Sequence, residues 1–133
     1  MDMSDAIDRF RDSLPADLSA RLDLSPDSLS AIEAYALETY PSASHAKPLT
    51  EARALDGMAR YVGQVFRAHL GGKWKIDFSD PRNAFHGLPQ LVGMSGQRAQ
   101  ICPLTLVTSS LDRRTGKQLR FVFDNCAREA AKS

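Results

Sequence analysis

Residues 55–78 read LDGMARYVGQVFRAHLGGKWKIDF, and two different apolar periods meet within this stretch. Before the pair of glycines, apolar residues recur every three or four positions, a spacing that places them on one face of an α-helix. After the pair, Trp74, Ile76 and Phe78 alternate with polar residues, which is typical of a half-buried β-strand. We therefore predict a helix that ends at Gly71 and is followed by a strand with one apolar face.

The helix is expected to begin near Pro48, because a proline in the first turn loses no intrahelical hydrogen bond. Glu51 in the same turn faces the positive end of the helix dipole. Gly57 and Gly63 interrupt the apolar pattern, and each destabilises a helix by about 1 kcal/mol relative to alanine. They predict that a neighbouring backbone packs closely at these positions; a ligand lying against Gly63 is the alternative.

The chain of 133 residues has the length of one domain, residues 1–133. With 43% hydrophobic and 25% charged residues, its composition is that of an ordinary globular protein. No apolar run is long enough to predict a membrane span. The acidic start lacks the apolar segment of a signal peptide, so we expect a cytoplasmic protein.

The N-terminal part is predicted to be helical. Within residues 1–24, Ile7 and Phe10 share a helical face, but few other apolar residues anchor this segment, which predicts a loosely packed helical arm. Ser25 followed by Pro26 is a strong start signal for the next helix, with a capping side chain and then a proline at the first helical position.

The region after Trp74 is predicted to form a small antiparallel sheet of about three strands. A turn signal covers residues 79–83, a second strand is expected over 91–94, and a third over 98–102. Pro103 then opens a C-terminal pair of helices, in which apolar residues again follow helical spacing. A β-hairpin is the alternative for this last segment, because Leu119, Phe121 and Phe123 alternate.

Charge is distributed unevenly along the chain, although its net charge is only +1. Residues 1–40 contain nine acidic and three basic side chains, whereas residues 41–133 contain seven acidic and fourteen basic ones. Either the acidic helices lie across the basic remainder and the charges largely cancel, or the protein has two faces of opposite sign that are open to partners.

No pattern for catalysis, metal binding or cofactor binding is present. Cys102 and Cys126 are 24 positions apart, unlike zinc or redox motifs, and we interpret both as small buried hydrophobic residues. His45, His69 and His86 do not have the spacing of a helical metal site. A cysteine–histidine pair brought together by the fold is the remaining route to an enzyme. We predict no catalytic residues, no metal and no cofactor.

Two groups of residues are predicted to bind a partner. Aromatic side chains surround the turn after the tryptophan strand, and exposed rings of this kind form protein-binding hot spots; the alternative is that Trp74 and Phe85 fill the core. Basic side chains follow the first C-terminal helix, but a net charge of +1 is far from the strongly basic balance of nucleic-acid binders. The predicted binding residues are Tyr61, Trp74, Asn83, Phe85, His86, Arg113, Arg114, Lys117 and Arg120.

Residues 61–63, YVG, and 71–74, GGKW, together form the pattern Y-x-G-x(7)-G-G-x-W. With residues 26–40 and Pro103, this pattern resembles a group of small uncharacterised bacterial proteins. The resemblance implies an α+β fold, and similar small proteins are sometimes encoded beside toxins and act as immunity proteins. It implies no catalytic residues, and the acid usual after the helical glycine is Gln64 here.

Together these observations predict an α+β domain with N-terminal helices, a small antiparallel sheet of about three strands and a C-terminal helical pair. The expected function is non-catalytic binding of another protein, either as an immunity protein that neutralises a cognate toxin or as an accessory subunit. The alternative is a regulatory module that binds a small ligand or nucleic acid through its basic C-terminal half. The oligomeric state stays open.

Overall fold

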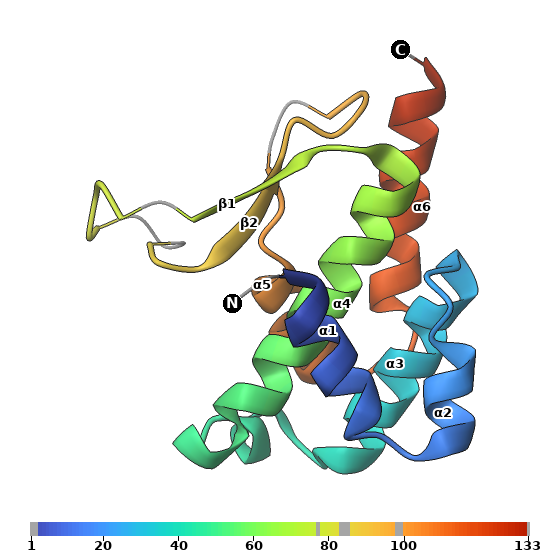
Figure 1. The fold of residues 1–133 in the computed structure, drawn as a ribbon, viewed down its shortest axis with the longest axis vertical. Helices are drawn as coiled ribbons and strands as arrows, with labels where there is room; N and C mark the ends of the chain where they lie inside the picture. The colour runs from blue at the N-terminus through green and yellow to red at the C-terminus, as the bar shows by residue number, and fades with distance from the viewer. Residues whose placement is uncertain (1–2, 77, 83–85, 98–99, 133) are drawn as a thin grey trace.

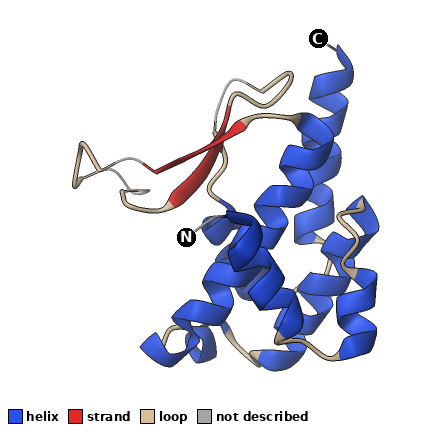
Figure 2. Ribbon diagram, viewed as in Figure 1, coloured by secondary structure: helices blue, strands red, loops and turns tan. Residues whose placement is uncertain are grey.

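The computed structural model describes residues 3–76, 78–82, 86–97 and 100–132. The protein is α+β: helices surround one long central helix, and a two-stranded antiparallel sheet lies to one side of them (Figure 1). Figure 2 shows how far helix outweighs strand. In chain order the elements are α1 (Met3–Asp12), α2 (Ala16–Arg21), α3 (Pro26–Thr39), the 3₁₀ turns η1 (Ala43–Ala46) and η2 (Leu49–Glu51), α4 (Ala52–Leu70), β1 (Lys73–Ile76), β2 (Pro89–Val92), α5 (Pro103–Arg113) and α6 (Gln118–Lys132).

Helix α4 is the centre of the fold, as its sequence predicts. It contacts α1, α3, α5, α6 and β2, and Tyr61, Val62, Val65 and Phe66 on it are completely buried. The 3.6-residue apolar period thus becomes a core that other helices cover from several sides. No helix in the described ranges has both the length and the apolar character needed to cross a membrane.

The ends of α4 follow the predicted signals with one change. The chain enters through the 3₁₀ turn η2, which follows Pro48, so regular α-helix begins only at Ala52. At the other end Gly71 has a φ of 77° and Gly72 a φ of 99°, values that residues with a side chain rarely adopt. These two glycines let the chain leave the helix and begin β1 within two residues.

Helix α1, which lies in the segment predicted as a loosely packed helical arm, contacts α4. Ile7 and Phe10 of α1 are buried, and Leu22 after α2 is fully buried. A Cβ atom on Gly57 would lie 2.7 Å from the Phe10 ring, so this glycine admits the ring. The expected close packing at Gly57 is therefore present, with an aromatic side chain in the place of the predicted backbone.

Helix α3 begins as its sequence predicts. Pro26 occupies the first helical position, and the Oγ atom of Ser25 accepts a hydrogen bond of 3.3 Å from the backbone N–H of Ser28. Tyr40, just past the end of α3, donates a hydrogen bond of 2.8 Å from its hydroxyl to the Glu51 carboxylate. This bond connects the end of α3 to the start of α4.

The sheet has two strands in the described residues, which corrects the prediction of about three. β1 and β2 run antiparallel, with Lys73 opposite Val92 and Ile76 opposite Pro89. Among the described residues of the predicted third strand, Ile101 pairs with β2 through an isolated bridge to Leu91, and residues 98–99 lie outside the described ranges. Pro103 begins α5 two residues after Ile101, so the pairing does not continue in that direction.

The C-terminal segment consists of two helices, α5 and α6, so the helical prediction is confirmed and the hairpin alternative is wrong. Phe123 of α6 meets Phe66 of α4 edge to face, with ring centroids 5.3 Å apart. Cys102 and Cys126 are free and buried, as predicted for small hydrophobic residues. Both helices contribute to the same core as α4.

Candidate functional site

The β1–β2 hairpin extends away from the helices (Figure 1), and we call its described residues, 73–76, 78–82 and 86–92, the arm. Its base follows α4 directly, and its far end carries the turn that connects β1 to β2. A two-stranded hairpin alone is only marginally stable in water. The arm therefore depends on contacts at its base.

Trp74 fixes the base of the arm to α4. A Cβ atom on Gly63 would lie 2.1 Å from the Trp74 ring and 2.8 Å from the Pro103 ring, so these two rings fill the space over the glycine. The indole Nε1–H of Trp74 donates to the Gln64 side-chain oxygen at 3.4 Å. Gly63 thus serves close packing, as predicted, although against rings and not backbone, and no room is left there for the alternative ligand.

The far end of the arm exposes apolar side chains. Ile76 is 45% exposed and Phe78 is 67% exposed. His86 holds the second of these in place: its Nε2 donates to the Phe78 carbonyl at 3.1 Å, and the two rings meet edge to face at 5.7 Å. The predicted site residues Asn83 and Phe85 lie outside the described residues.

Tyr61, another predicted binding residue, belongs to the core. It is fully buried, its hydroxyl donates to the Ser28 Oγ at 2.7 Å, and the same oxygen accepts from the Leu24 N–H at 3.1 Å. Burial raises the pKa of the Tyr61 hydroxyl. The residue joins α4 to α3 and has no surface to offer a ligand.

The four predicted basic residues separate into two pairs. Arg114 and Arg120 bind groups within the fold, whereas Arg113 and Lys117 have no ion pair among the described residues. The Arg114 guanidinium donates to two carbonyls at the end of α3, those of Leu37 and Tyr40, both at 2.9 Å. Arg114 therefore completes hydrogen bonds that the helix end leaves open.

Arg120 joins α6 to the start of α3. Its guanidinium pairs with Asp124 at 3.0 Å, one turn further along α6, and also with Asp27. The hydrogen bonds to these two carboxylates raise the pKa of Arg120. Its ion pair with Asp27 connects the acidic first 40 residues to the basic remainder, so part of the uneven charge is neutralised internally.

Glu33 is a structural residue that sequence reasoning missed. It is 1% exposed, and its carboxylate accepts hydrogen bonds from two N–H groups at the start of α6, from Leu119 at 2.7 Å and from Gln118 at 3.2 Å. A carboxylate at a helix N-terminus is stabilised by the helix dipole. The sequence does contain an indication of this role, because Glu33 follows Ile32 and lies on the face of α3 that is buried.

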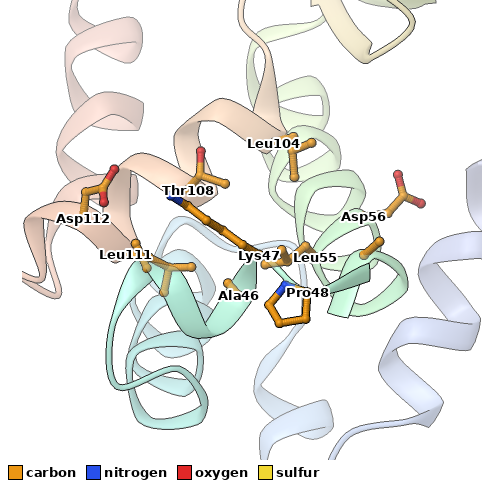
Figure 3. Close-up of a pocket in the computed structure, with 11 residues that line it drawn as sticks. Ala46, Lys47, Pro48, Leu55, Asp56, Leu104, Thr108, Leu111 and Asp112 are labelled. Atoms are coloured by element: carbon orange, nitrogen blue, oxygen red, sulfur yellow. The ribbon is translucent and has the colours of Figure 1, made fainter. Parts of the chain in front are cut away.

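A hollow of about 330 Å³ lies between the η1–η2 segment and α5. Leu55, Leu104 and Leu111 contribute apolar walls, Asp112 stands at one end, and the Lys47 side chain runs along the hollow toward α5 (Figure 3). A mostly apolar hollow with a few charged groups is typical of small-molecule sites. The sequence analysis did not predict it, because the small and polar residues 42–47 carry no pattern that marks the edge of a pocket.

The structure shows the surroundings of the side chains that could bind a metal ion or act as a nucleophile. The described residues contain no group of three His, Cys, Asp or Glu side chains that could hold a metal ion. Burial raises the pKa of the Cys126 thiol, which disfavours the reactive thiolate. His69 hydrogen-bonds to the Leu24 carbonyl at 2.8 Å and lies edge-on to Phe123, so it has structural contacts.

Of the predicted aromatic cluster, the structure brings Trp74 to the base of the arm and His86 to its far end. Phe78, which is exposed beside His86, was expected on a buried face together with Trp74. The alternation was read correctly, but α4 lies beneath only the first part of the strand. Comparison of the chain with protein-family models, curated proteins and solved structures gives no match.

Proposed function

We propose that the chain is a non-catalytic cytoplasmic protein that binds another protein, either neutralising a toxin or serving as an accessory subunit, and that the arm is its contact surface. The observation that carries this proposal is the exposure of Ile76 and Phe78 at the far end of the arm. Exposed aromatic and aliphatic side chains that lie together are typical of protein-binding sites.

The arrangement around Phe78 favours binding for a second reason. Its backbone carbonyl and its ring are both held by His86. A side chain that is already fixed in place loses less conformational entropy when a partner covers it. Phe78 therefore has the properties of an anchor residue that fills a pocket on the partner.

The charges of the arm indicate the character of that partner. Lys73, Lys75 and Arg82 are exposed on the arm, and Arg82 lies 3.6 Å from the carboxylate of Asp80. Complementary charge speeds association and excludes wrong partners. The proposed partner therefore presents an acidic surface with an apolar pocket.

Affinity purification of the tagged chain from the cells that express it natively tests the proposal. We expect one protein to co-purify in a stoichiometric amount, to be retained by a Phe121→Ser variant, and to be lost from a Phe78→Ser variant. Phe121 on α6 is a matched control, because it is 60% exposed against 67% for Phe78. Equal recovery with both variants, or no stoichiometric protein with the unaltered chain, would contradict the proposal.

The hollow beside α5 favours a second candidate, a regulatory module that binds a small apolar ligand. Leu104 lines the hollow, whereas Leu49 is 92% exposed and does not. The dye anilinonaphthalene sulfonate is a suitable probe, because its fluorescence rises when it enters apolar surroundings such as the walls of this hollow. Saturable dye fluorescence that Leu104→Glu removes and Leu49→Glu leaves unchanged would support this candidate, and equal fluorescence with both variants would eliminate it.

The nucleic-acid form of this second candidate has less support. Arg114 and Arg120 already bind groups within the protein, so Arg113 and Lys117 are the members of the predicted basic patch that have no ion pair among the described residues. Two exposed cations give weak, strongly salt-dependent binding to a phosphate backbone. Protein binding through the arm therefore comes first.

A further inference from the structure

We propose that the outer edge of β1 takes up an extended acidic segment of the partner protein as an additional β-strand. This inference rests on the proposed function and names the way in which the partner binds. It follows from the direction of the backbone groups in the arm and from the charges beside them.

The hydrogen bonds of β2 determine which backbone groups of β1 are unused. The Leu91 N–H donates to the Ile101 carbonyl at 2.9 Å, and the Ile101 N–H donates to the Leu91 carbonyl at 3.0 Å. Successive residues of an antiparallel strand direct their backbone groups to opposite sides. Gln90 and Val92, on either side of Leu91, therefore direct their backbone N–H and C=O groups toward β1.

The register of the two strands then shows which backbone groups of β1 point toward β2 and which point to the outer edge. Gln90 lies opposite Lys75 and Val92 opposite Lys73, so these two lysines use their backbone groups inside the hairpin. Trp74 and Ile76 direct their N–H and C=O groups to the outer edge. Pro89, which has no N–H to donate, lies opposite Ile76, where no bond to β1 is required.

The outer edge of β1 is unpaired within the described part of the chain, where the sheet consists of β1 and β2 alone. An unpaired strand edge is a template for another strand, and several families of peptide-binding domains use one in this way. The N–H and C=O groups of Trp74 and Ile76 would give an incoming segment four backbone hydrogen bonds. Such bonds supply affinity without requiring a particular sequence.

The side chains of β1 select the segment. Lys73 and Lys75 are exposed on one face of the strand, and Trp74 and Ile76 lie on the other. A segment that alternates acidic and apolar residues would place its carboxylates beside the lysines and its apolar side chains beside Ile76. Antiparallel pairing of β1 with a second copy of itself would instead set lysines against lysines, so the charges favour a different, acidic chain.

The competing explanation is that the lysines protect a short edge strand from pairing at all. Natural proteins use short edge strands and lysine side chains for that purpose. The two explanations differ in one respect that can be measured: only strand addition predicts that the charge of the selected segment follows the charge at positions 73 and 75.

Selection of linear decapeptides from a random displayed library, with the complete chain as bait, tests the inference. We expect enriched peptides that alternate Asp or Glu with apolar residues. With the charge-reversed variant Lys73→Glu/Lys75→Glu, the enriched peptides should carry Lys or Arg in place of the acids. Enrichment of peptides without acidic alternation, selection that ignores the charge reversal, or no enrichment at all would overturn the inference.

A pair of variants at position 76 separates the backbone from the side chain. Ile76→Pro removes an N–H that points outward and makes no bond in the hairpin, so the fold should tolerate it. We expect Ile76→Pro to weaken binding of a selected peptide about tenfold more than Ile76→Ala, the loss of roughly one hydrogen bond. Equal binding by the two variants would overturn the inference.

A measurement on the unaltered chain makes the test independent of variant folding. Amide hydrogen exchange at Trp74 and Ile76 should slow when the selected peptide binds, because both N–H groups then have acceptors. Unchanged exchange at both amides would exclude strand addition. If the native partner is lost with Phe78→Ser and kept with Ile76→Pro, protein binding stands and strand addition fails; if Phe78→Ser keeps the partner, the proposed function itself fails.

Discussion

The helical body, by which we mean helices α1 to α6, differs from the arm in whether its polar groups have partners within the protein. In the body, the buried carboxylate of Glu33 binds two N–H groups of α6, and the guanidinium of Arg114 binds two carbonyls of α3. In the arm, the outward backbone groups of β1 have no partner among the described residues, and Phe78 is exposed. The polar groups of the body thus stabilise the fold, whereas the outward backbone groups of β1 are those that the proposed partner would bind.

The largest effect is expected where the body buries a charge. Replacing Glu33 with alanine leaves two N–H groups of α6 without their acceptor and should lower the free energy of unfolding by about 3–4 kcal/mol. Chemical denaturation measures this change. Glu38→Ala, at an exposed position on the same helix, is the control and should change stability by less than about 0.5 kcal/mol. Equal losses for the two variants would mean that Glu33 is not a cap.

The second largest loss of stability is expected when the contact between the body and the arm is removed. Trp74→Ala empties the space over Gly63 and should destabilise the protein by about 3 kcal/mol, near the lower end for a large aromatic residue because the ring is partly exposed. Thermal or denaturant unfolding gives the value. A loss under about 1 kcal/mol would show that the arm does not depend on this ring, and Trp74 would then return to the list of binding residues.

Two neighbouring arginines offer a smaller and sharper comparison. Arg114→Ala removes the hydrogen bonds to the end of α3 and should lower stability by about 1–2 kcal/mol. Arg113→Ala, at an exposed position next to it, should change stability by less than about 0.5 kcal/mol. Denaturation of both variants under the same conditions gives the two losses of stability. A larger loss for Arg113→Ala than for Arg114→Ala would contradict the assignment of Arg114 to helix capping.

The smallest effect on stability is expected in the arm. Phe78→Ser should leave the free energy of unfolding within about 0.5 kcal/mol of the unaltered chain, because the ring is mostly exposed. Phe123→Ala in the body, where the ring is 5% exposed, should lose about 3 kcal/mol. A large loss for Phe78→Ser would place Phe78 among the structural residues and remove it from the contact surface.

The sequence predicted the body better than the arm. Helical periods predicted α4, α5 and α6, because apolar spacing reports directly on which face is buried. Alternation predicted the apolar face of β1, but it carries no information on how far α4 extends beneath that face. The partial burial of Trp74 and the exposure of Phe78, four positions later, therefore could not be distinguished from the sequence.

The individual roles of charged residues depended on the tertiary fold. Arg113 and Arg114 are adjacent and chemically identical, yet only Arg114 has the left-handed backbone, with a φ of 55°, at the end of α5 and reaches the carbonyls of α3. Likewise, Glu33 accepts hydrogen bonds from residues 118 and 119, which are 85 and 86 positions away in the sequence. Such contacts are set by the packing of α3 against α6, which no local pattern records.

The most direct test of the difference between body and arm is amide hydrogen exchange along β1 in the unaltered chain. NMR should find the N–H groups of Lys73 and Lys75 protected, because they bond to β2, and those of Trp74 and Ile76 exchanging much faster. This alternation would confirm that the arm presents an open strand edge. Protection of Trp74 and Ile76 equal to or greater than that of the two lysines would contradict it.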